Sequence, residues 1–426
     1  MGLPELLQKL VDESIEIIKK QIEEGKLQRI QRVYVKHKIE KFTYDKGSIS
    51  FTASFPSIVK EEWDLGSTTK SLSEIKNLPI YKECYQAIAE EYNVSQSQAE
   101  FWLSRFVGML IVTYLNNKID SRRIRDLIDT FMDDLEDNPK EWKIETWLKG
   151  VWLETDEIKI DEGITIRKPR PSDFEYEHPL DLYPVLEMYT GEMPSAILEI
   201  HKRLKIEPFV YDEHEKLILL LQLYKLGSVL VIQSKWRPKS IISGGGTTRP
   251  AMIWPTTYTY PLTDEDKDAL PEFIKRFLPL LPTDEFGRPL SSDPVGIAIL
   301  RYQDALLKPE AIENKIAYGI MGLEVLYSKE RAGISHRLAQ RVAKVFGVFD
   351  RSPIEVYKLI KEGYEIRSNI VHGSPLRIDD PREMKNLLDN ILEILRKSIL
   401  LFLQIRRKKK KDDFLNLIDE SLIDDN

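Results

Sequence analysis

From Ser292 onward, the sequence alternates apolar helical stripes with signals that start a helix. A carboxylate or hydroxyl at such a position accepts hydrogen bonds from the free amides of the first turn, and a proline fits that turn without losing a bond. Gly373 and Pro375 end the fourth segment. This punctuation predicts a compact all-helical bundle over residues 292–411. The five helix starts are Asp293-Pro294, Pro309, Ser335, Ser352-Pro353 and Asp380-Pro381.

Residues 1–290 mix helical and strand patterns, which predicts an α+β region without assigning its fold. Apolar spacing predicts helices over 3–24 and 80–135, and strands at 33–39 and 49–55 around a turn. Short strands are expected at 151–153, 157–160 and 164–166, and a helix at 193–205. We therefore divide the chain into a mixed helical and hairpin domain (1–140), an α+β middle region (141–290), the helical bundle (292–411) and an acidic tail (412–426).

Charge is distributed unevenly along the chain. Lysine and arginine number 39 against 48 acids in residues 1–291, but 23 against 15 in residues 292–411, while the tail has six acids and no base. A basic module on an acidic body favours an anionic partner, and RNA is the leading one. The alternative is a basic surface with no specific partner.

Cysteine usage and hydropathy indicate the compartment. Cys84 is the single cysteine, so an intramolecular disulfide and a cysteine-based zinc site are both excluded. The first residues lack the pattern of a signal peptide, and the apolar run 391–405 is interrupted by charges. We expect a cytoplasmic protein that does not enter a membrane.

The motif Arg367-Ser368-Asn369-Ile370-Val371-His372 places a permanent cation and an imidazole five residues apart near the end of the fourth helix. RNA carries its own nucleophile, the 2′-hydroxyl, so its cleavage needs a titratable group near neutrality and a cation for the charged phosphorane. One histidine does not easily serve as both base and acid, and a two-fold dimer supplies a second one. The competing interpretation is that Arg367 forms a salt bridge to Glu324 or Glu365 and His372 merely ends the helix.

The order and spacing of several segments in residues 292–405 resemble the HEPN superfamily, in particular its Apea-like branch. The resemblance implies a four- or five-helix bundle that forms a homodimer. It also implies RNA cleavage without a metal or other cofactor, with Arg367 and His372 in the catalytic motif and His372 as the base. Ser368 stands where the family often has asparagine, and Asn369 comes one position later, so both are supporting candidates together with Glu324. The segments are 297–302, 322–326, 334–341 and 367–373.

The resemblance leads to two hypotheses for function. The first is a metal-independent endoribonuclease, with the defence or toxin-like roles associated with the family. The second is a non-catalytic HEPN module for dimerisation and RNA binding, in which Arg367 and His372 only contact phosphate or pack.

Further basic residues are candidates for an RNA path, with solvent-exposed or ion-paired charge as the alternative. The candidates are His336, Arg337 and Arg341 on the third helix and Arg406, Arg407 and Lys408 in the cationic run 406–411. A related hypothesis is that the acidic tail folds back over this run, anchored by Phe414, Leu415, Leu417 and Ile418. The segment 236–239 is either a base-stacking element or a core tryptophan with exposed neighbours.

Overall fold

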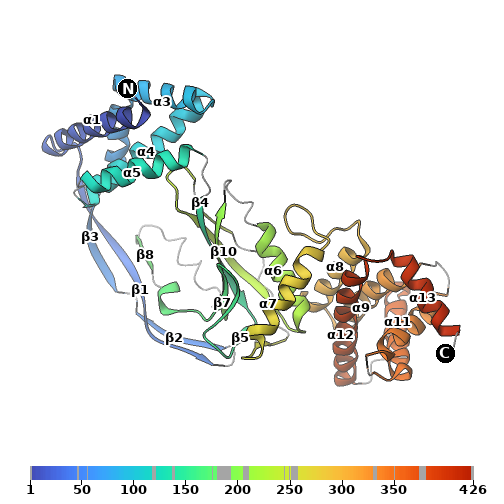
Figure 1. The fold of residues 1–426 in the computed structure, drawn as a ribbon. Helices are drawn as coiled ribbons and strands as arrows, with labels where there is room; N and C mark the ends of the chain where they lie inside the picture. The colour runs from blue at the N-terminus through green and yellow to red at the C-terminus, as the bar shows by residue number, and fades with distance from the viewer. Residues whose placement is uncertain are drawn as a thin grey trace.

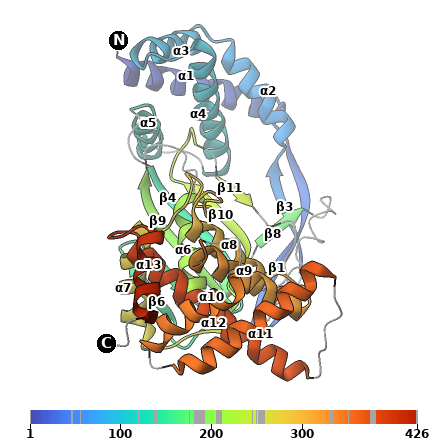
Figure 2. The same cartoon turned by 90° about the vertical axis from the view of Figure 1, so that its right-hand side faces the viewer.

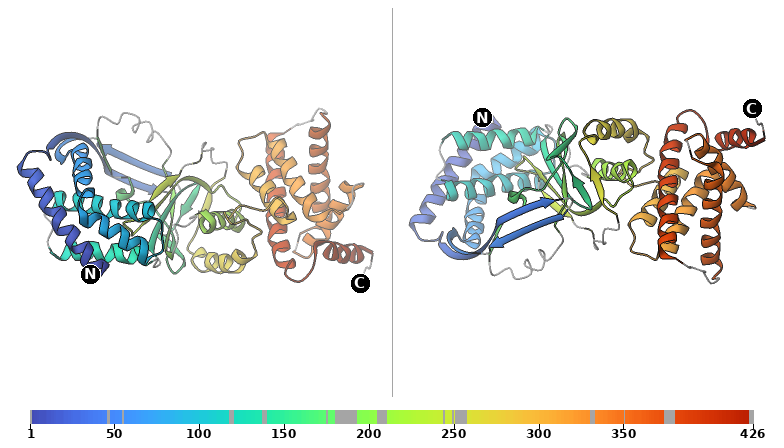
Figure 3. Two further views of the ribbon diagram at one scale, coloured as in Figure 1. Left: turned by 90° about the horizontal axis from the view of Figure 1, so that it is seen from above. Right: turned by 90° about the horizontal axis from the view of Figure 1, so that it is seen from below.

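The computed structural model describes residues 2–45, 48–54, 56–117, 121–136, 140–174, 176–179, 193–204, 211–243, 245–248, 250, 258–329, 333–349, 351–373 and 380–423. Helices near the N-terminus, a central sheet and helices near the C-terminus follow one another along the molecule (Figures 1 and 3). The expected order of an α+β region followed by a helical region is confirmed. Among the described helices, none combines the length and the apolar character needed to cross a bilayer.

The N-terminal helices pack around an apolar core of their own. They confirm the helices expected over 3–24 and 80–135, whereas α2 was not predicted. These helices are α1 (Leu3–Glu23), α2 (Leu65–Lys76), α3 (Pro79–Glu91), α4 (Gln96–Asn117) and α5 (Ser121–Leu135).

A long β arm is inserted between α1 and α2. It consists of β1 (Arg29–Asp45), β2 (Ser48–Ser54) and β3 (Ser57–Trp63), and β1 pairs antiparallel with both of the others. The two predicted strands of the hairpin are thereby confirmed. The arm reaches the middle of the molecule (Figure 1), where β1 also pairs with β8 (Tyr176–Pro179).

The middle region is built on a sheet with strand order β11-β10-β4-β9-β7-β6. A separate short parallel pair joins β5 (Val151–Leu153) to β12 (Tyr260–Leu262). The predicted strands correspond to β5, β6 and β7 and are confirmed. The strands of the sheet are β4 (Lys140–Lys149), β6 (Glu157–Asp161), β7 (Ile164–Arg167), β9 (Ala196–Leu204), β10 (Leu230–Pro238) and β11 (Gly246–Thr248), and the helices are α6 (Tyr211–Tyr224) and α7 (Asp266–Phe277).

The helix predicted at 193–205 is wrong, because Ala196–Leu204 form strand β9. This strand lies between β4 and β7 in the sheet. Ile197, Leu198 and Ile200 are all buried, so both faces of the strand are covered. An interior strand covered on both faces has no need to alternate apolar and polar residues, and its short apolar run therefore looks like one face of a helix.

The C-terminal helices confirm the five predicted segments and add a sixth helix from the tail. Asp293, Ser352 and Asp380 cap α8, α11 and α12 through their side chains, as expected. Ser335 does not cap α10, because the N-cap is Gly333 in a left-handed conformation (φ +67°). The helices are α8 (Pro294–Leu307), α9 (Ile312–Tyr327), α10 (Ile334–Gly347), α11 (Pro353–His372), α12 (Pro381–Ile405) and α13 (Lys411–Ile423).

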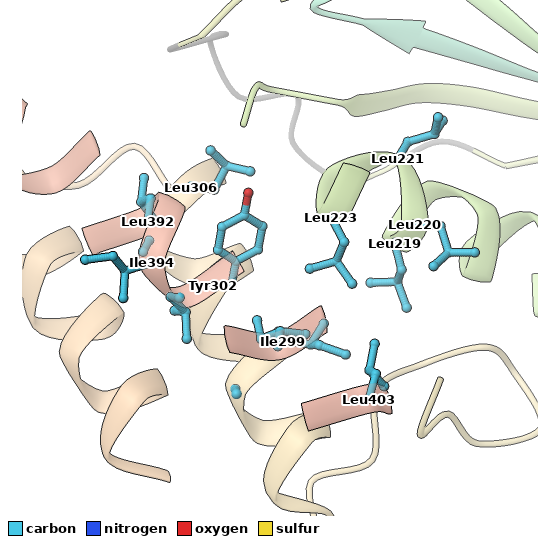
Figure 4. Packing of buried hydrophobic residues seen from close by; sticks show 14 of the residues in the cluster. Leu219, Leu220, Leu221, Leu223, Ile299, Tyr302, Leu306, Leu392, Ile394 and Leu403 are labelled. Carbon is cyan, nitrogen blue, oxygen red and sulfur yellow. The ribbon is translucent and has the colours of Figure 1, made fainter. Parts of the chain in front are cut away.

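The bundle and the middle region share a continuous hydrophobic core. Leucines of α6, among them Leu219 and Leu223, face Ile299 and Tyr302 of α8 across this junction (Figure 4). The Tyr302 hydroxyl donates a hydrogen bond of 3.1 Å to the carbonyl of Gln222. The bundle is therefore anchored on α6 by both apolar packing and polar contacts.

Two helical glycines allow a test of how closely their helices are packed, because alanine is expected to lower the stability of the protein at one of them and to raise it at the other. A Cβ on Gly296 of α8 would lie 2.1 Å from the carbonyl oxygen of Leu290, whereas one on Gly108 of α4 would meet no atom within 4 Å. Gly296→Ala is expected to destabilise the protein by about 1–3 kcal/mol, because backbone must move. Gly108→Ala is expected to stabilise it by about 0.5–1 kcal/mol, because alanine favours the helix. If the calorimetric unfolding midpoints of Gly296→Ala and Gly108→Ala shifted in the same direction, the difference in packing between the two positions would be contradicted.

Candidate active site at the end of helix α11

The motif of residues 367–372 occupies the last turns of α11, and His372 is the final residue of the helix. Gly373 ends it in a left-handed conformation (φ +66°), a geometry that glycine adopts without a steric penalty. His372 and its neighbour Val371 are exposed. The imidazole is thus accessible at the end of α11, one of the C-terminal helices, which lie at the opposite end of the molecule from the N-terminal helices (Figures 1 and 2).

Arg367 forms an ion pair with Glu324 of α9, at 3.3 Å between Nη2 and Oε2. The guanidinium also lies 5.7 Å from the ring centroid of Tyr364, one turn earlier on α11. The pairing predicted for the case of a purely structural Arg367 is therefore present. Tyr364 was not among the candidates, although its i, i+3 spacing from Arg367 is a signal that sequence analysis can use.

This ion pair leaves one hydrogen-bonding atom unsatisfied on each side chain. Oε1 of Glu324 and Nε of Arg367 are buried and have no hydrogen-bond partner among the described residues. Burial raises the pKa of Glu324, and the nearby guanidinium of Arg367 opposes that shift without cancelling it. Buried polar atoms normally have partners, so Nε of Arg367 can still donate to an acceptor such as a phosphate oxygen, and Oε1 of Glu324 can still accept from a donor.

Arg367 and His372 point in different directions from the same helix. Five residues of a regular α-helix separate them by about 7.5 Å along the axis and about 140° around it. Arg367 reaches α9, and about a quarter of its side chain is exposed (24%), while His372 is exposed to solvent. The two groups can flank one phosphate, but they do not contact each other.

Ser368 and Asn369, the two supporting candidates, are half-buried on α11. Within the residues that the structure covers, neither side chain has a hydrogen-bond partner. Their role in orienting a substrate stays a prediction.

The assignment of Arg341 to an RNA surface does not agree with the structure. Its side chain is only 2% exposed, and its Nε and Nη2 donate to the carboxylate of Asp419 at 2.7 and 2.8 Å. A third bond of 2.7 Å runs from Nη1 to the carbonyl of Tyr327. Arg341 therefore fastens α13 to the bundle, and its guanidinium is not available to a phosphate.

His336 and Arg337 are exposed at the start of α10, as an RNA path would require. The His336 Nδ1 atom lies 2.8 Å from the hydroxyl of Tyr357 on α11. From Tyr357 to His372 is about 22 Å along α11, at 1.5 Å per residue. The structure therefore does not place these residues beside His372.

The cationic run after α12 lies far from His372. His372 precedes the start of α12, and Arg406 follows its end. The helix has 25 residues, so its two ends are about 37 Å apart. Arg406, Arg407 and Lys408 are exposed and line an open depression of about 830 Å³. Arg406 is within 3.2 Å of Asp293, whereas Lys411 caps α9 by donating to carbonyls of Val325 and Ser328.

The described part of the tail, residues 412–423, forms a helix beside the bundle instead of lying over the cationic run, and only Asp413 borders the depression that the run lines. As α13 it packs against α10 and α12, with Leu415 and Ile418 buried and Phe414 against the same core. Leu417 is exposed. The tail is therefore attached through its apolar face and Asp419.

Comparisons with known proteins identify no relative: no family model, no curated protein and no solved structure matches this chain. Within the described residues, histidine, cysteine and acidic side chains form no group of three or more that suits a metal ion.

Acid is expected to loosen α13. Hydrogen bonds from Arg341 hold the pKa of Asp419 below its usual value, against the opposing effect of burial. A carboxylate with a lowered folded pKa contributes stability above its unfolded pKa, about 3.9, and loses it as the pH falls through the folded value. Amide hydrogen exchange of residues 411–423, corrected for intrinsic rates, should therefore rise below about pH 4.

The matched variants for this test are Asp419→Asn and Glu420→Gln. Asp419→Asn should loosen α13 at neutral pH and remove its acid step, because it eliminates the titrating group. Glu420 is exposed on the same helix, so Glu420→Gln should behave like the wild type. An acid step that persists in Asp419→Asn would assign the loosening to other groups.

Proposed function

We propose that this protein is an endoribonuclease of HEPN type that cleaves RNA without a metal. The observation that carries the proposal is the end of α11, where an exposed imidazole lies about 1.4 turns beyond a guanidinium whose Nε donor has no partner among the described residues. The resemblance of residues 292–405 to the Apea-like HEPN branch supports the same assignment. It also suggests a cytoplasmic role in defence or a toxin-like response.

The proposed reaction uses the 2′-hydroxyl of RNA as the nucleophile. Its oxygen attacks the adjacent phosphorus and its proton passes to the neutral imidazole of His372, while the P–O5′ bond breaks. The leaving 5′-oxygen takes a proton from a second acid, and the products are a 2′,3′-cyclic phosphate and a 5′-hydroxyl. Arg367 stabilises the added negative charge of the phosphorane through its guanidinium.

A second copy of this chain supplies the acid. One histidine in a free site is either base or acid at a given moment, and a two-fold axis near the end of α11 places two copies of the motif at one scissile phosphate. Exposure of Val371 beside His372 is consistent with a contact between copies at this end.

The second candidate function is a binding module without catalysis. The open depression beside the run 406–411, far from His372, favours it, because it offers consecutive cations to a phosphate backbone. In that case RNA contacts the far end of α12, and Arg367 stays paired with Glu324.

The decisive variant is His372→Ala, with Glu362→Ala as its matched control. Both residues are exposed on α11, and Glu362 is not among the candidate site residues. Incubated with end-labelled structured RNA and excess EDTA, the wild type and Glu362→Ala should cleave and leave 2′,3′-cyclic phosphate ends. His372→Ala should be slower by a factor of about 10²–10⁴, the usual contribution of a general base or acid.

Other outcomes separate the alternatives. Equal cleavage by wild type and His372→Ala would remove His372 from the mechanism. If the wild type and His372→Ala both bound RNA in a salt-sensitive manner and neither cleaved any RNA tested, the result would support the binding module.

The requirement for a second copy is tested by mixing subunits. An excess of His372→Ala protein should lower the cleavage rate per wild-type chain, because mixed dimers contain one imidazole instead of two. The same excess of Glu362→Ala protein should leave that rate unchanged. If the cleavage rate per wild-type chain did not change with an excess of His372→Ala, while light scattering showed dimers, one histidine would suffice for cleavage.

A further inference from the structure

An open depression lies where α12 ends and α13 begins. Its volume is about 830 Å³, and it is lined by the cationic run 406–411 and by the start of α8. The lining has six lysines and arginines but only two aspartates, Asp293 and Asp413, so its net charge is +4. The protein as a whole has a formal net charge of −7. The depression is therefore a local concentration of positive charge in an acidic protein.

The run is held in place at both of its ends. Arg406 is within 3.2 Å of Asp293, and Lys411 donates to two carbonyls at the end of α9, at 2.6 and 2.8 Å. Between these anchors, two backbone N–H groups of the run donate to the carbonyl of Ile405, at 2.8 and 3.0 Å. The side chains of residues 407–410 therefore project from a backbone of fixed shape and not from a frayed helix end.

The positive charge of the run exceeds what the nearby acids balance. All four side chains of residues 407–410 are exposed, and they form no ion pair or hydrogen bond within the described part of the chain. Asp293 is already committed to Arg406 and to the first amides of α8. The dipole of α12 favours a cation in its last turn only, and Arg406 is the residue that ends this helix. Four neighbouring cations are thus available to an anion with several charges.

The chemistry of the run indicates which polyanion fits it. Consecutive cations on one short segment suit the regularly spaced phosphates of a nucleic acid strand, because each contact releases counterions from the strand. Segments that bind a membrane surface usually add apolar side chains that enter the acyl boundary. Every residue from 406 to 410 is charged, so the run offers no such side chain. A nucleic acid strand therefore fits the run better than a lipid surface.

Exposed positive charge continues from the run towards the site on α11. Helix α10 lies between them, because it packs against both α13 and α11. At the start of α10, the hydroxyl of Ser335 accepts a hydrogen bond of 3.1 Å from the exposed Lys361 of α11. Ser335 is a neutral partner, so this contact does not balance the ammonium charge of Lys361. Ser335 follows Ser328, which accepts from Lys411, by seven residues, and these span at most about 25 Å.

Lys361 and His372 share one face of α11. They are 11 residues apart, which is about three turns, and this separates them by about 16 Å along the axis. Glu365 lies on the same face between them, so the positive charge forms a series of separate points and not a continuous stripe. A strand that contacts the run and Lys361 is thereby directed along α11 towards the imidazole.

We propose that the depression anchors the RNA that the site on α11 cuts, with Arg407, Lys408, Lys409 and Lys410 as its phosphate contacts. This inference rests on the proposed function and adds the class of substrate. His372 and the run lie at opposite ends of α12, about 37 Å apart. At about 3.4 Å per stacked nucleotide, that distance corresponds to about 11 nucleotides. The substrate is therefore an RNA of more than about ten nucleotides, and shorter RNAs reach only one of the two sites.

The test variant is Arg407→Gln/Lys408→Gln/Lys409→Gln/Lys410→Gln, assayed with an RNA 24-mer and with a tetranucleotide in excess EDTA. All four side chains are exposed, so folding should be unaffected. The KM for the 24-mer should rise at least about tenfold with kcat unchanged, because anchoring contacts are equally strong in the ground state and the transition state. Both constants for the tetranucleotide should equal those of the wild type, since this RNA is too short to reach the depression.

The matched control is Lys9→Gln/Lys70→Gln/Lys82→Gln/Lys159→Gln, which removes four exposed lysines outside the depression. It changes the net charge by the same amount, so its constants for both RNAs should equal those of the wild type. The proposal is overturned if the test and control variants have the same KM for the 24-mer. It is also overturned if the test variant loses activity on the tetranucleotide, because the run would then act on the site itself.

Equilibrium binding separates this proposal from the proposed function. Fluorescein-labelled 24-mer is titrated by anisotropy against His372→Ala protein, with and without the four substitutions of the run, so that the RNA stays intact. The substitutions should lower the affinity at least about tenfold, because charge-assisted contacts are lost. The slope of log K against log salt should become shallower by up to about 2.8, since each phosphate contact on a single strand contributes about 0.7. A wild type that cuts no RNA, while this binding persists, would refute cleavage at α11 and leave the depression as an RNA-binding surface.

A membrane surface is the alternative that the same variants test. The probe is vesicles of phosphatidylserine and phosphatidylcholine, and we expect the test and control variants to bind them equally. If the test variant alone lost binding to the vesicles, while the 24-mer bound both variants equally, the depression would belong to a membrane surface and the proposal would be overturned.

Discussion

The arrangement of the two halves of this protein depends on one buried arginine. Arg396 of α12 donates to the carbonyls of Leu223 and Tyr224, at 2.8 Å each, where α6 ends. Its charge is balanced on its own helix by Glu393, at 2.7 Å, and it sits at the negative end of the α6 dipole. Carbonyls at a helix end lack intrahelical partners, so Arg396 satisfies two of them, beside Tyr260 at Leu221 and Tyr302 at Gln222, and ties α12 to the end of α6.

In the ion pair of Arg367 with Glu324, in contrast, not every hydrogen-bonding atom has a partner. Arg396 has donors matched to acceptors, whereas Arg367 and Glu324 each retain a buried atom without a partner among the described residues. The raised pKa of Glu324 shows that burial costs this carboxylate more than the single contact returns. A pair that is incompletely satisfied is poorly explained as a device for stability alone, since Nε of Arg367 still lacks an acceptor and Oε1 of Glu324 still lacks a donor among the described residues.

Local signals in the sequence predicted the bundle well and the rest less well. Asp293, Ser352 and Asp380 act through neighbouring backbone amides, so their capping role is visible in a short window. The strand β9 was mistaken for a helix because its two faces are buried in two different hydrophobic clusters, with Ile197 in one and Leu198 and Ile200 in the other, built from residues far away in sequence. The burial of Arg341 was equally invisible, since its partner Asp419 lies 78 residues later. For a structural Arg367, the sequence analysis offered Glu324 or Glu365 as the partner, and the structure shows the pair with Glu324.

The row of Lys143, His201 and Arg237 illustrates why charge pairing in a sheet escapes sequence analysis. These residues are separated by dozens of positions, and only the antiparallel register of three strands brings them into one row. The acids that balance the row come from two of these strands, because Lys143 lies 3.1 Å from Glu145 and 3.3 Å from Glu199, and His201 lies 2.8 Å from Glu199. A short window of sequence shows the charges but not which of them meet, so the electrostatics of the middle region follow from its topology.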